Sequence, residues 1–450
     1  MLCAVCRHCG LCNGDGSVVS QKSIVTQEEF TFYTDVFPDA SFSESDIGIA
    51  IDIGTTTIAV CAVQLATLKV CARRGQENAQ RAYGSDVISR IQFALSGDGL
   101  SVLHDSIVSQ LCALSEAVLR DVRALFLSER KGMPCVKRMT VTGNTAMLCF
   151  LTGKSVKGLS AFPFSVPDEF GFELPARTLL GGLSSDFDSC SAFIPPVLSA
   201  FVGADTMCAL LSSGLVKKQT VSALCDIGTN CEMALYNPEQ KKLWCTSAAA
   251  GPAFEGYGIS CGMAAREGAV ARVTCSEDGK VQCEVIGGGR AEGVCGTGLL
   301  SAVSAFVSGG LIDTDGAICS GEDCLRLCGS VVLTQKDIRQ LQLAKAAVRT
   351  GLTVLCEEAG LTEGDIEHLF LAGGFGTKLD EHDACVIKMF PSECERAVCH
   401  AGNASLAGAV MLWVNDSYRE ECEHIKRMVQ VTNLAERNDF SDRFLSALNF

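Results

Sequence analysis

Two stretches of the chain share one pattern of apolar residues interrupted by a short polar turn. Residues 47–63 read Ile-Gly-Ile-Ala-Ile-Asp-Ile-Gly-Thr-Thr-Thr-Ile-Ala-Val-Cys-Ala-Val, and residues 222–235 read Ser-Ala-Leu-Cys-Asp-Ile-Gly-Thr-Asn-Cys-Glu-Met-Ala-Leu. Each pattern predicts a buried β-hairpin. A single Asp-Ile-Gly-Thr is a weak signal, whereas two copies in the same β context indicate a duplicated lobe with a nucleotide between the halves.

Between and after these hairpins the pattern predicts further elements. Residues 102–127 have helical periodicity, and residues 138–142 read as a strand that runs into Gly143-Asn144-Thr145. Residues 195–206 lead into a helix start that carries Asp205. This acid either complements the helix dipole or orients the water that attacks a γ-phosphate.

The C-terminal part contains a long amphipathic helix. Residues 334–337, Thr-Gln-Lys-Asp, resemble a capping box. The apolar stripe that follows is formed by Ile338, Leu341, Val348, Leu352 and Leu355, and Lys345 falls on the same stripe. This lysine either extends along the apolar surface to water or meets a bound nucleotide. Residues 368–380 form an apolar strand that ends in glycines.

The Asp-Ile-Gly-Thr turns have a chemistry that suits a polyphosphate. Glycine lets the backbone approach closely, while amide N–H groups and threonine hydroxyls donate to phosphate oxygens. Aspartate can hold Mg²⁺ or its water shell. Two competing nucleotide motifs are absent: Leu148 stands where a P-loop ending in Gly153-Lys154-Ser155 needs its first glycine, and no G-x-G-x-x-G follows a strand.

Composition and charge narrow the function further. The chain has 450 residues and a net charge of −15, so its field repels nucleic acids and anionic membranes. The longest uncharged stretches, residues 139–153 and 189–204, are shorter than the roughly 18 residues of a membrane span. No export signal follows the N-terminus. We expect a soluble, cytoplasmic protein that contacts neither nucleic acid nor membrane.

The 26 cysteines fall into two groups. In a reducing compartment, most of the 22 scattered ones are expected to be small apolar residues. Cys3, Cys6, Cys9 and Cys12 instead form a C-x2-C-x2-C-x2-C run that resembles the cluster-binding run of bacterial ferredoxins. The last spacing is one residue short and no proline follows. An iron–sulfur centre of the 4Fe–4S type is favoured, and a zinc site or a metal-free arm remains open.

The order of these motifs resembles the phosphate-1, connect-1, phosphate-2 and adenosine segments of the ASKHA superfamily, which includes actin and the acetate and sugar kinases. Within it the chain is similar to the reductive activators of corrinoid-dependent methyltransferases and corrinoid proteins, the RACE or RamA-like group. This resemblance covers about residues 47–450 and rests on the following strings: Asp226-Ile-Gly-Thr-Asn, Ala250-Gly-Pro-Ala-Phe-Glu-Gly256, Ile259-Ser-Cys-Gly-Met263, Gly293-Val-Cys-Gly-Thr-Gly298, Leu333-Thr-Gln-Lys-Asp-Ile338 with its continuation to Ala347, Ala372-Gly-Gly-Phe-Gly376 and Gly402-Asn-Ala-Ser405.

The resemblance implies an α/β fold with two RNase H-like lobes and a nucleotide cleft. We expect a cysteine arm at 1–20, a linker at 21–46, lobe I at 47–220, and lobe II with closing helices at 221–450. It also implies ATP and Mg²⁺ as cofactors, an N-terminal redox centre, and a corrinoid protein or methyltransferase as the partner whose Co(II) is reduced to Co(I). Most such activators begin with a plant-type 2Fe–2S domain and a linker domain, for which 46 residues are too few. The cysteine run is expected to replace that domain, or a separate ferredoxin-like donor supplies the electron. The sequence is compatible with a homodimer.

The candidate site residues follow from the motifs and the resemblance together. Asp52 and Asp226 are expected to organise Mg²⁺, and Asp205 to position water. The predicted phosphate contacts are Gly54, Thr55, Thr56, Thr57, Gly228, Thr229 and Asn230, and the predicted adenosine contacts are Gln342, Lys345, Arg349, Gly373, Gly374 and Gly376.

Three other functions fit parts of the pattern. A 2-hydroxyacyl-CoA dehydratase activator also joins this fold to a 4Fe–4S cluster, but that family's motifs are not found here. A small-molecule kinase fits the fold and gives no role to four clustered thiols. A chaperone-like ATPase would need a substrate domain after the adenosine segment.

Overall fold

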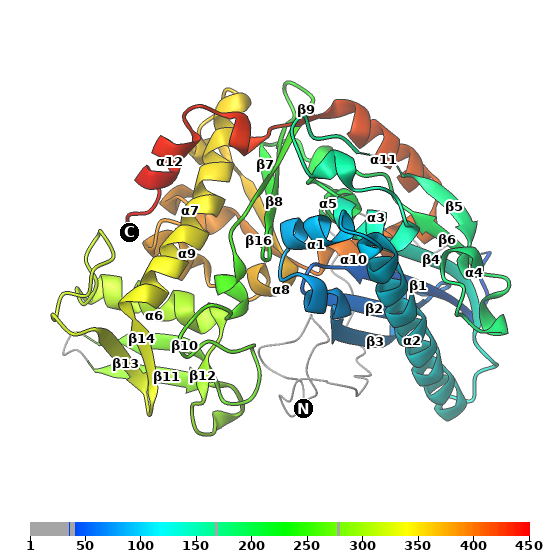
Figure 1. Ribbon diagram of the computed structural model, residues 1–450, viewed down its shortest axis with the longest axis horizontal. Coiled ribbons are helices and arrows are strands. Elements are labelled where there is room, and N and C mark those ends of the chain that lie inside the picture. The colour runs from blue at the N-terminus through cyan, green and yellow to red at the C-terminus, as the bar shows by residue number, and fades with distance from the viewer. Residues whose placement is uncertain (1–35, 37–40, 167–169, 277–279) are drawn as a thin grey trace.

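The framework of the protein is a pair of six-stranded sheets. The computed structural model describes residue 36 and residues 41–166, 170–276 and 280–450, so the predicted cysteine arm and most of the predicted linker lie outside the described residues. In Figure 1 the first sheet lies on the right, the second near the centre, and a smaller unit of strands and helices on the left.

The first sheet has the order β3-β2-β1-β4-β6-β5. Its strands are β1 (Asp46–Ile53), β2 (Thr57–Gln64), β3 (Lys69–Glu77), β4 (Cys135–Gly143), β5 (Phe172–Pro175) and β6 (Ser191–Ile194). The hairpin predicted for residues 47–63 is confirmed as β1 and β2, which pair antiparallel, while β4 runs parallel to β1. Asp52 stands opposite Thr142 in that parallel pair, so the end of β1 lies beside the turn that follows β4.

The second sheet repeats this plan in the order β16-β15-β7-β8-β9-β17. Its strands are β7 (Ser222–Ile227), β8 (Cys231–Asn237), β9 (Lys242–Ala248), β15 (His368–Ala372), β16 (Val398–Gly402) and β17 (Val429–Val431). The second predicted hairpin is confirmed as β7 and β8, with β15 parallel to β7. Asp226 stands opposite Ala372, so it lies beside the glycines that follow β15.

A smaller unit, not expected from the sequence, lies between β9 and the long helix α7 (Gln335–Glu358). It consists of β10 (Ala269–Cys275), β11 (Val281–Val285), β12 (Gly293–Val294), β13 (Cys324–Cys328), β14 (Val331–Thr334) and α6 (Gly296–Ser308). Its strands form a three-stranded and a two-stranded sheet. Its core residues Val270, Leu299 and Phe306 are continuous with the core around α7.

Helices cover the sheets. The remaining α-helices are α1 (Val87–Ala94), α2 (Gly99–Ser128), α3 (Thr145–Thr152), α4 (Ala176–Leu179), α5 (Ala204–Ser213), α8 (Gly373–Gly376), α9 (Glu381–Val386), α10 (Ala404–Val414), α11 (Ser417–Met428) and α12 (Phe440–Ser446). The capping box predicted at Thr334 is confirmed, since Thr334 and Asp337 bond each other's backbone at the start of α7.

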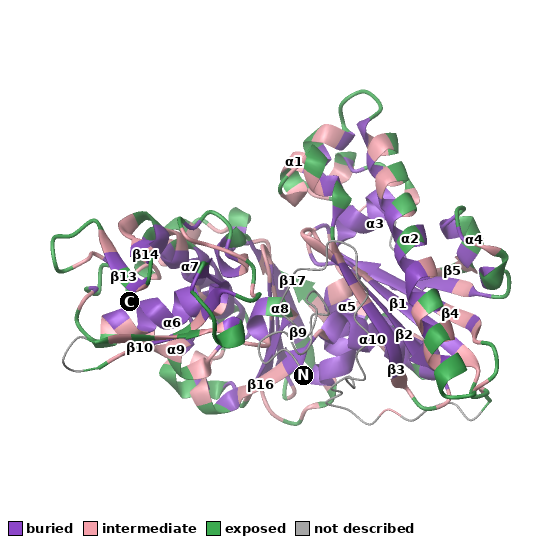
Figure 2. Cartoon of the chain, turned by 90° about the horizontal axis from the view of Figure 1, so that it is seen from below, coloured by how far each residue is buried: buried purple, intermediate pink, exposed green. Residues whose placement is uncertain are grey.

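Helix α2 is the one described helix that is long and apolar enough to cross a membrane. Just over half of its most apolar window, 56%, is buried inside the protein, where it packs on β3 and α3. Figure 2 shows its buried face turned toward the first sheet and its exposed face turned outward. This is the pattern of a helix that closes a core.

Helices α5 and α10 join the two sheets. A Cβ on Gly408 of α10 would lie 1.9 Å from the carbonyl oxygen of Cys208 in α5, so glycine lets the two backbones touch. Their shared core includes Ala50 of the first sheet and Leu224 of the second. The mixed α/β class with two lobes is therefore confirmed. The boundary at residues 220 and 221 stays a prediction, since α10 also packs against β1 and β4.

Candidate nucleotide site

The turns of the two hairpins meet at the junction of the lobes. The amide of Gly54 donates to Thr57 O at 3.0 Å, and that of Gly228 donates to Asn230 O at 2.9 Å, so a backbone bond from the glycine closes each turn, and the second turn is one residue shorter. The hydroxyls of Thr56 and Thr229 lie 3.3 Å apart. The structure thus brings together the phosphate contacts predicted in each hairpin.

Glu255 fastens this junction from a third element, the short helix η5 (Pro252–Glu255). Its Oε1 accepts a hydrogen bond from the Thr229 hydroxyl at 3.0 Å, and Thr56 is a further hydrogen-bond partner. Its Oε2 is buried and has no hydrogen-bond partner among the residues that the structure describes. Burial raises the pKa of this carboxyl group, and the threonine hydrogen bonds partly offset the rise. A buried acid with one unsatisfied oxygen is a costly feature that commonly marks a functional site.

Four acids influence one another beside the turns: Asp52 in β1, Asp205 in the first turn of α5, Asp226 in β7 and Glu232 in β8. Burial raises the pKa of Asp52 and of Glu232 well above the usual value, and the charges of Asp205 and Asp226 add to both shifts. Burial and then Asp205 raise the pKa of Asp226 to about 7. Burial raises the pKa of Asp205 to about 6, although the Thr206 amide donates to it at 2.8 Å.

Crowded carboxylates of this kind favour protonation or a bound cation. Among the described residues, no three His, Cys, Asp or Glu side chains stand close enough around one point to enclose a metal ion. A hydrated Mg²⁺ does not need such a cage, because it keeps several waters and uses one or two carboxylates together with substrate phosphates. The donor set of Asp52 and Asp226 therefore fits Mg²⁺ and does not fit a closed metal site.

The glycine loop after β15 lies directly against Asp226. Gly373 has a φ of 83°, and a Cβ there would lie 2.6 Å from Oδ1 of Asp226. The loop forms one helical turn, α8, in which Gly374 is exposed. Phe375 of that turn stacks on Phe254 of η5 at a ring distance of 4.5 Å. The turn predicted to approach a purine is thus tied to the element that carries Glu255.

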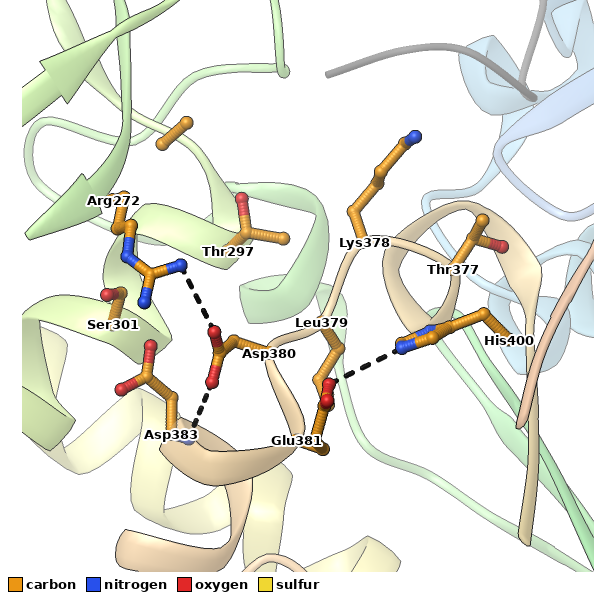
Figure 3. Close-up of a pocket in the computed structure, with 11 residues that line it drawn as sticks. Arg272, Thr297, Ser301, Thr377, Lys378, Leu379, Asp380, Glu381, Asp383 and His400 are labelled. Atoms are coloured by element: carbon orange, nitrogen blue, oxygen red, sulfur yellow. Dashed lines mark hydrogen bonds and ion pairs between the residues drawn. The ribbon is translucent and has the colours of Figure 1, made fainter. Parts of the chain in front are cut away.

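A cavity of about 290 Å³ opens just beyond this loop. Thr297 and Ser301 of α6 line one side, and Thr377 and Lys378, which follow α8, line another (Figure 3). An ion pair between Arg272 and Asp380 at 3.2 Å borders it, as does a contact between His400 Nε2 and Glu381 at 3.5 Å. Its volume is close to the lower limit for a small-molecule site, about 300 Å³.

The three predicted adenosine contacts on α7 are not brought to this site. Lys345 is fully buried, its Nζ donates to Asn449 O at 2.5 Å, and burial lowers its pKa to about 7. Gln342 donates to Asp315 O and Leu448 O, and Arg349 donates to Glu363 at 2.7 Å. Lys345 therefore does not extend to water, and each of the three has a protein partner. The nucleotide contact of these three residues stays a prediction, and their hydrogen bonds to protein groups do not favour it.

The four N-terminal cysteines and the other 22 have different outcomes. Cys3, Cys6, Cys9 and Cys12 lie outside the described residues, so their metal role stays a prediction. The 22 described cysteines are free thiols, and Cys319 alone among them is exposed. This is the distribution expected of small apolar residues in a core.

Sequence reasoning missed Glu232 and Glu255. Glu232 follows Asn230 by two residues, but the first hairpin has Ile58 at the matching position, so the repeat gave no signal. Glu255 lies in the string Ala250-Gly-Pro-Ala-Phe-Glu-Gly256 that supported the resemblance, where no role was evident. Asn144 was read only as part of a turn, yet it donates to the Thr55 hydroxyl at 3.2 Å.

Comparison with known proteins shows the family of the chain. Residues 220–450 match the family model of the C-terminal domain of RACo, the ASKHA domain, and residues 47–218 match that of the RACo middle region. The corrinoid activation enzyme RamQ of Eubacterium limosum is 30% identical over 91% of this chain and 71% of RamQ. The Co(II) methylated amine-specific corrinoid protein reductase of Methanosarcina barkeri is 27% identical over 90% of this chain and 77% of that protein.

A solved structure supports the same relationship. The reductive activator for a corrinoid, iron–sulfur protein superposes with a TM-score of 0.79 at 31% identity. The match covers 91% of this chain and 66% of that one, so the chain spans slightly less than two thirds of the length of the solved activator. The chain therefore belongs to the RACo family, an ASKHA family that includes reductive activators of corrinoid proteins.

Proposed function

We propose that this protein binds ATP and Mg²⁺ between its lobes and uses them to activate a corrinoid protein, whose inactive Co(II) is reduced to Co(I). The observation that carries the nucleotide site is the meeting of two Gly-Thr turns from different lobes beside Asp52, Asp205 and Asp226. The corrinoid part of the proposal is supported by family membership and by the names of the relatives.

The two turns would clamp one phosphate chain. Gly54, Thr55, Thr56 and Thr57 approach it from the first hairpin, and Gly228, Thr229 and Asn230 from the second. Their donors are backbone amides, threonine hydroxyls and one carboxamide, so a protein with a net charge of −15 can hold a triphosphate without a basic patch. Asp52 and Asp226 would hold Mg²⁺ through its waters. When bound, the ion supplies the positive charge that both the phosphates and the crowded carboxylates require.

Asp205 is the proposed residue that positions and deprotonates the attacking water. It lies in the first turn of α5, close enough to Asp226 to raise the pKa of that residue. Its own pKa of about 6 lies near the neutral range in which a general base works best.

The purine would lie against Gly373, Gly374 and Gly376, which directly precede the cavity-lining residues Thr377 and Lys378. The polyphosphate would lie near Asp226, from which a Cβ on Gly373 would be only 2.6 Å away. Thr297, Ser301 and Thr377 offer hydroxyl partners for a ribose or a base edge.

ATP can drive an uphill electron transfer only if it changes the relative energies of two states of the complex. The junction of the two turns would have two arrangements. Without nucleotide, Thr56 and Thr229 are in contact, and phosphates that bind both turns would replace this contact. Closing or opening of the lobes would then change how the protein docks on the corrinoid protein. One electron would pass to Co(II) and yield Co(I).

The proposed electron source is an iron–sulfur centre. The proposed ligands of this iron–sulfur centre are Cys3, Cys6, Cys9 and Cys12. When bound, the centre would supply one low-potential electron, which it would receive from an external ferredoxin-like donor. The proposed location is the cytoplasm, with no nucleic-acid or membrane partner. A homodimer is one proposed oligomeric state.

Anaerobic purification followed by iron and sulfide quantification and a Mg²⁺-dependent ATPase assay tests this proposal. Iron and sulfide in the ratio of a cluster, together with ATP turnover that rises when a corrinoid protein is added, are expected. Stoichiometric zinc would contradict the redox centre, and absence of ATP binding would contradict the nucleotide site. Phosphate transfer to a sugar or a carboxylic acid would instead indicate a kinase.

A further inference from the structure

Arg90 is among the largest fully buried side chains of the protein, with 0% of its surface exposed. It belongs to α1, which lies behind the turn of the first hairpin. Its Nη2 donates to Thr55 O at 2.7 Å, its Nε donates to Gly84 O at 2.9 Å, and its Nη1 lies 3.5 Å from Met147 Sδ. All of these partners are neutral.

Within the described residues, Arg90 forms no ion pair. The charged groups that influence it are Arg81, which is like-charged, and Asp86, which caps the start of α1. Burial lowers the pKa of Arg90 to about 10, so the guanidinium is still protonated at neutral pH. A buried cation without an anion is costly to keep. Among the described residues, the protein therefore holds a buried positive charge without an ion-pair partner directly behind the Thr55 carbonyl.

The same turn is fixed from behind at three successive carbonyl groups. Asn78 Nδ2 donates to Gly54 O at 2.9 Å, Arg90 donates to Thr55 O, and the Asn78 amide donates to Thr56 O at 2.8 Å. In a trans peptide the N–H of the next residue points away from the carbonyl. Because these three carbonyls point toward Asn78 and Arg90, the amides of Thr55, Thr56 and Thr57 point away from those two residues.

Two of these amides are available for a ligand. In the part of the chain that the structure describes, neither the Thr55 nor the Thr56 amide donates to another group. Successive free amides that converge on one side form an anion-binding concavity. An uncompensated cation behind that concavity adds the charge that an anion there requires.

We infer that Arg90 is a positioning residue for the polyphosphate: it fixes the Thr55 peptide plane so that the Thr55 and Thr56 amides face the phosphates, and its charge complements them. This inference rests on the proposed nucleotide site and deepens it. A purely structural Arg90 would only tie α1 to the turn. The two roles differ in whether the residue affects phosphate recognition separately from stability.

The test compares ATP with adenosine, which lacks the phosphates. Dissociation constants for both are measured by calorimetry in Mg²⁺ buffer for the wild-type protein, Arg90→Met and Arg90→Lys. Arg74→Met is the matched control, because Arg74 is a partly buried arginine of the same lobe that is paired with Asp121 at 2.8 and 3.0 Å. Folding is checked by thermal unfolding.

Arg90→Met is expected to weaken ATP binding at least about tenfold, the scale of one hydrogen bond to a charged group, and to change adenosine binding less than about twofold. Arg90→Lys keeps the charge and is expected to recover part of the ATP preference. Arg74→Met is expected to lower stability and to leave the ratio of the two constants unchanged. If Arg90→Met does not fold, Arg90→Gln replaces it with the same expected ratio.

An unchanged ratio in the folded Arg90 variants, or an equal loss for ATP and adenosine, would overturn the inference. An equally changed ratio of the ATP and adenosine dissociation constants in Arg74→Met would also overturn the inference, since the effect would then be a general one of the lobe. If the wild-type protein bound no ATP, the proposed function itself would fail, which is a different outcome.

Discussion

The hydroxyl groups of Thr56 and Thr229 lie 3.3 Å apart, although one belongs to the turn after β1 and the other to the turn after β7. Glu255 holds the pair together through its bond to Thr229. The two turns that we propose to bind phosphate are therefore in contact in the structure, and a polyphosphate bound by both would have to replace that contact.

Replacing Thr229 by Val should weaken both the junction and ATP turnover. The change removes a hydroxyl and takes one of its two threonine donors from the buried Glu255 carboxyl group, a loss of about 1–3 kcal/mol in the free energy of unfolding. Turnover should fall at least about tenfold, because the same hydroxyl is a proposed phosphate donor. Urea unfolding and a steady-state ATPase assay measure the two effects. Thr229→Ser, which keeps the hydroxyl, should retain most of both quantities, and an equal loss in Ser and Val would argue against the role of the hydroxyl.

Replacing Asp226 by Asn should abolish turnover and stabilise the nucleotide-free protein. Removing its charge relieves Asp52 and Glu232, whose pKa values are raised in part by Asp226. The loss of turnover is expected to exceed about a hundredfold, as for other groups that act on charge in a transition state. The melting temperature without nucleotide should rise, and the Mg²⁺-ATP increment in melting temperature should vanish. Full ATPase activity in Asp226→Asn would remove this residue from the site.

Gly373 should not tolerate a side chain. A Cβ at this position would lie 2.6 Å from Asp226 Oδ1, and its φ of 83° is unfavourable for other residues. Gly373→Ala is therefore expected to weaken ATP binding by more than about tenfold, because it adds a strain of about 1–3 kcal/mol and displaces Asp226. Gly289→Ala, in the same half of the chain with open space around its Cβ, is the control and should bind ATP normally. Normal binding by Gly373→Ala would mean that the loop does not contact the nucleotide.

Lys345 should contribute more to stability as pH rises above neutrality. Burial lowers the pKa of this lysine to about 7, from 10.5 in the unfolded chain. Between these values Lys345 carries its proton in the unfolded state and not in the native state, so its contribution to the free energy of unfolding increases as pH rises from about 7 toward 10. Buried thiols such as Cys61 and Cys190 have raised pKa values and contribute in the opposite direction at alkaline pH, so the two variants are compared with the wild-type protein in urea titrations at a series of pH values. The stability of the wild-type protein relative to Lys345→Met should rise with pH, whereas its stability relative to Lys336→Met, which alters an exposed lysine of the same helix, should stay constant. A parallel slope in Lys345→Met would show that another group is responsible.

The parts of the fold that could be predicted from the sequence are those set by local patterns. Each hairpin turn begins at a glycine, Gly54 or Gly228, whose amide bonds to a carbonyl within the same turn. The start of α7 is set by Thr334 and Asp337, which form a capping box in its first turn. In each case the residues that determine the element are within a few positions of one another. Family resemblance then provided the pairing of the two lobes.

The remaining site residues could not be found in this way, because distant packing brings them in. Arg90 reaches the Thr55 carbonyl from α1, and Glu255 reaches Thr229 from η5. Lys345 shows the converse: its place on the apolar stripe was read correctly, but its partner, the Asn449 carbonyl, is about a hundred residues away. A helical pattern predicts which side chains are buried and does not predict which groups they contact.

The most direct test of the central claim is a spectroscopic assay of corrinoid reduction under anaerobic conditions. The purified protein is mixed with a Co(II) corrinoid protein and a low-potential donor, with and without Mg²⁺-ATP, and the appearance of Co(I) is followed by its absorption. Asp226→Asn is assayed in parallel, after its iron content and cluster spectrum have been matched to the wild-type protein. We expect Co(I) to form only with the wild-type protein and ATP. Equal Co(I) formation without ATP, or by Asp226→Asn, would contradict the account.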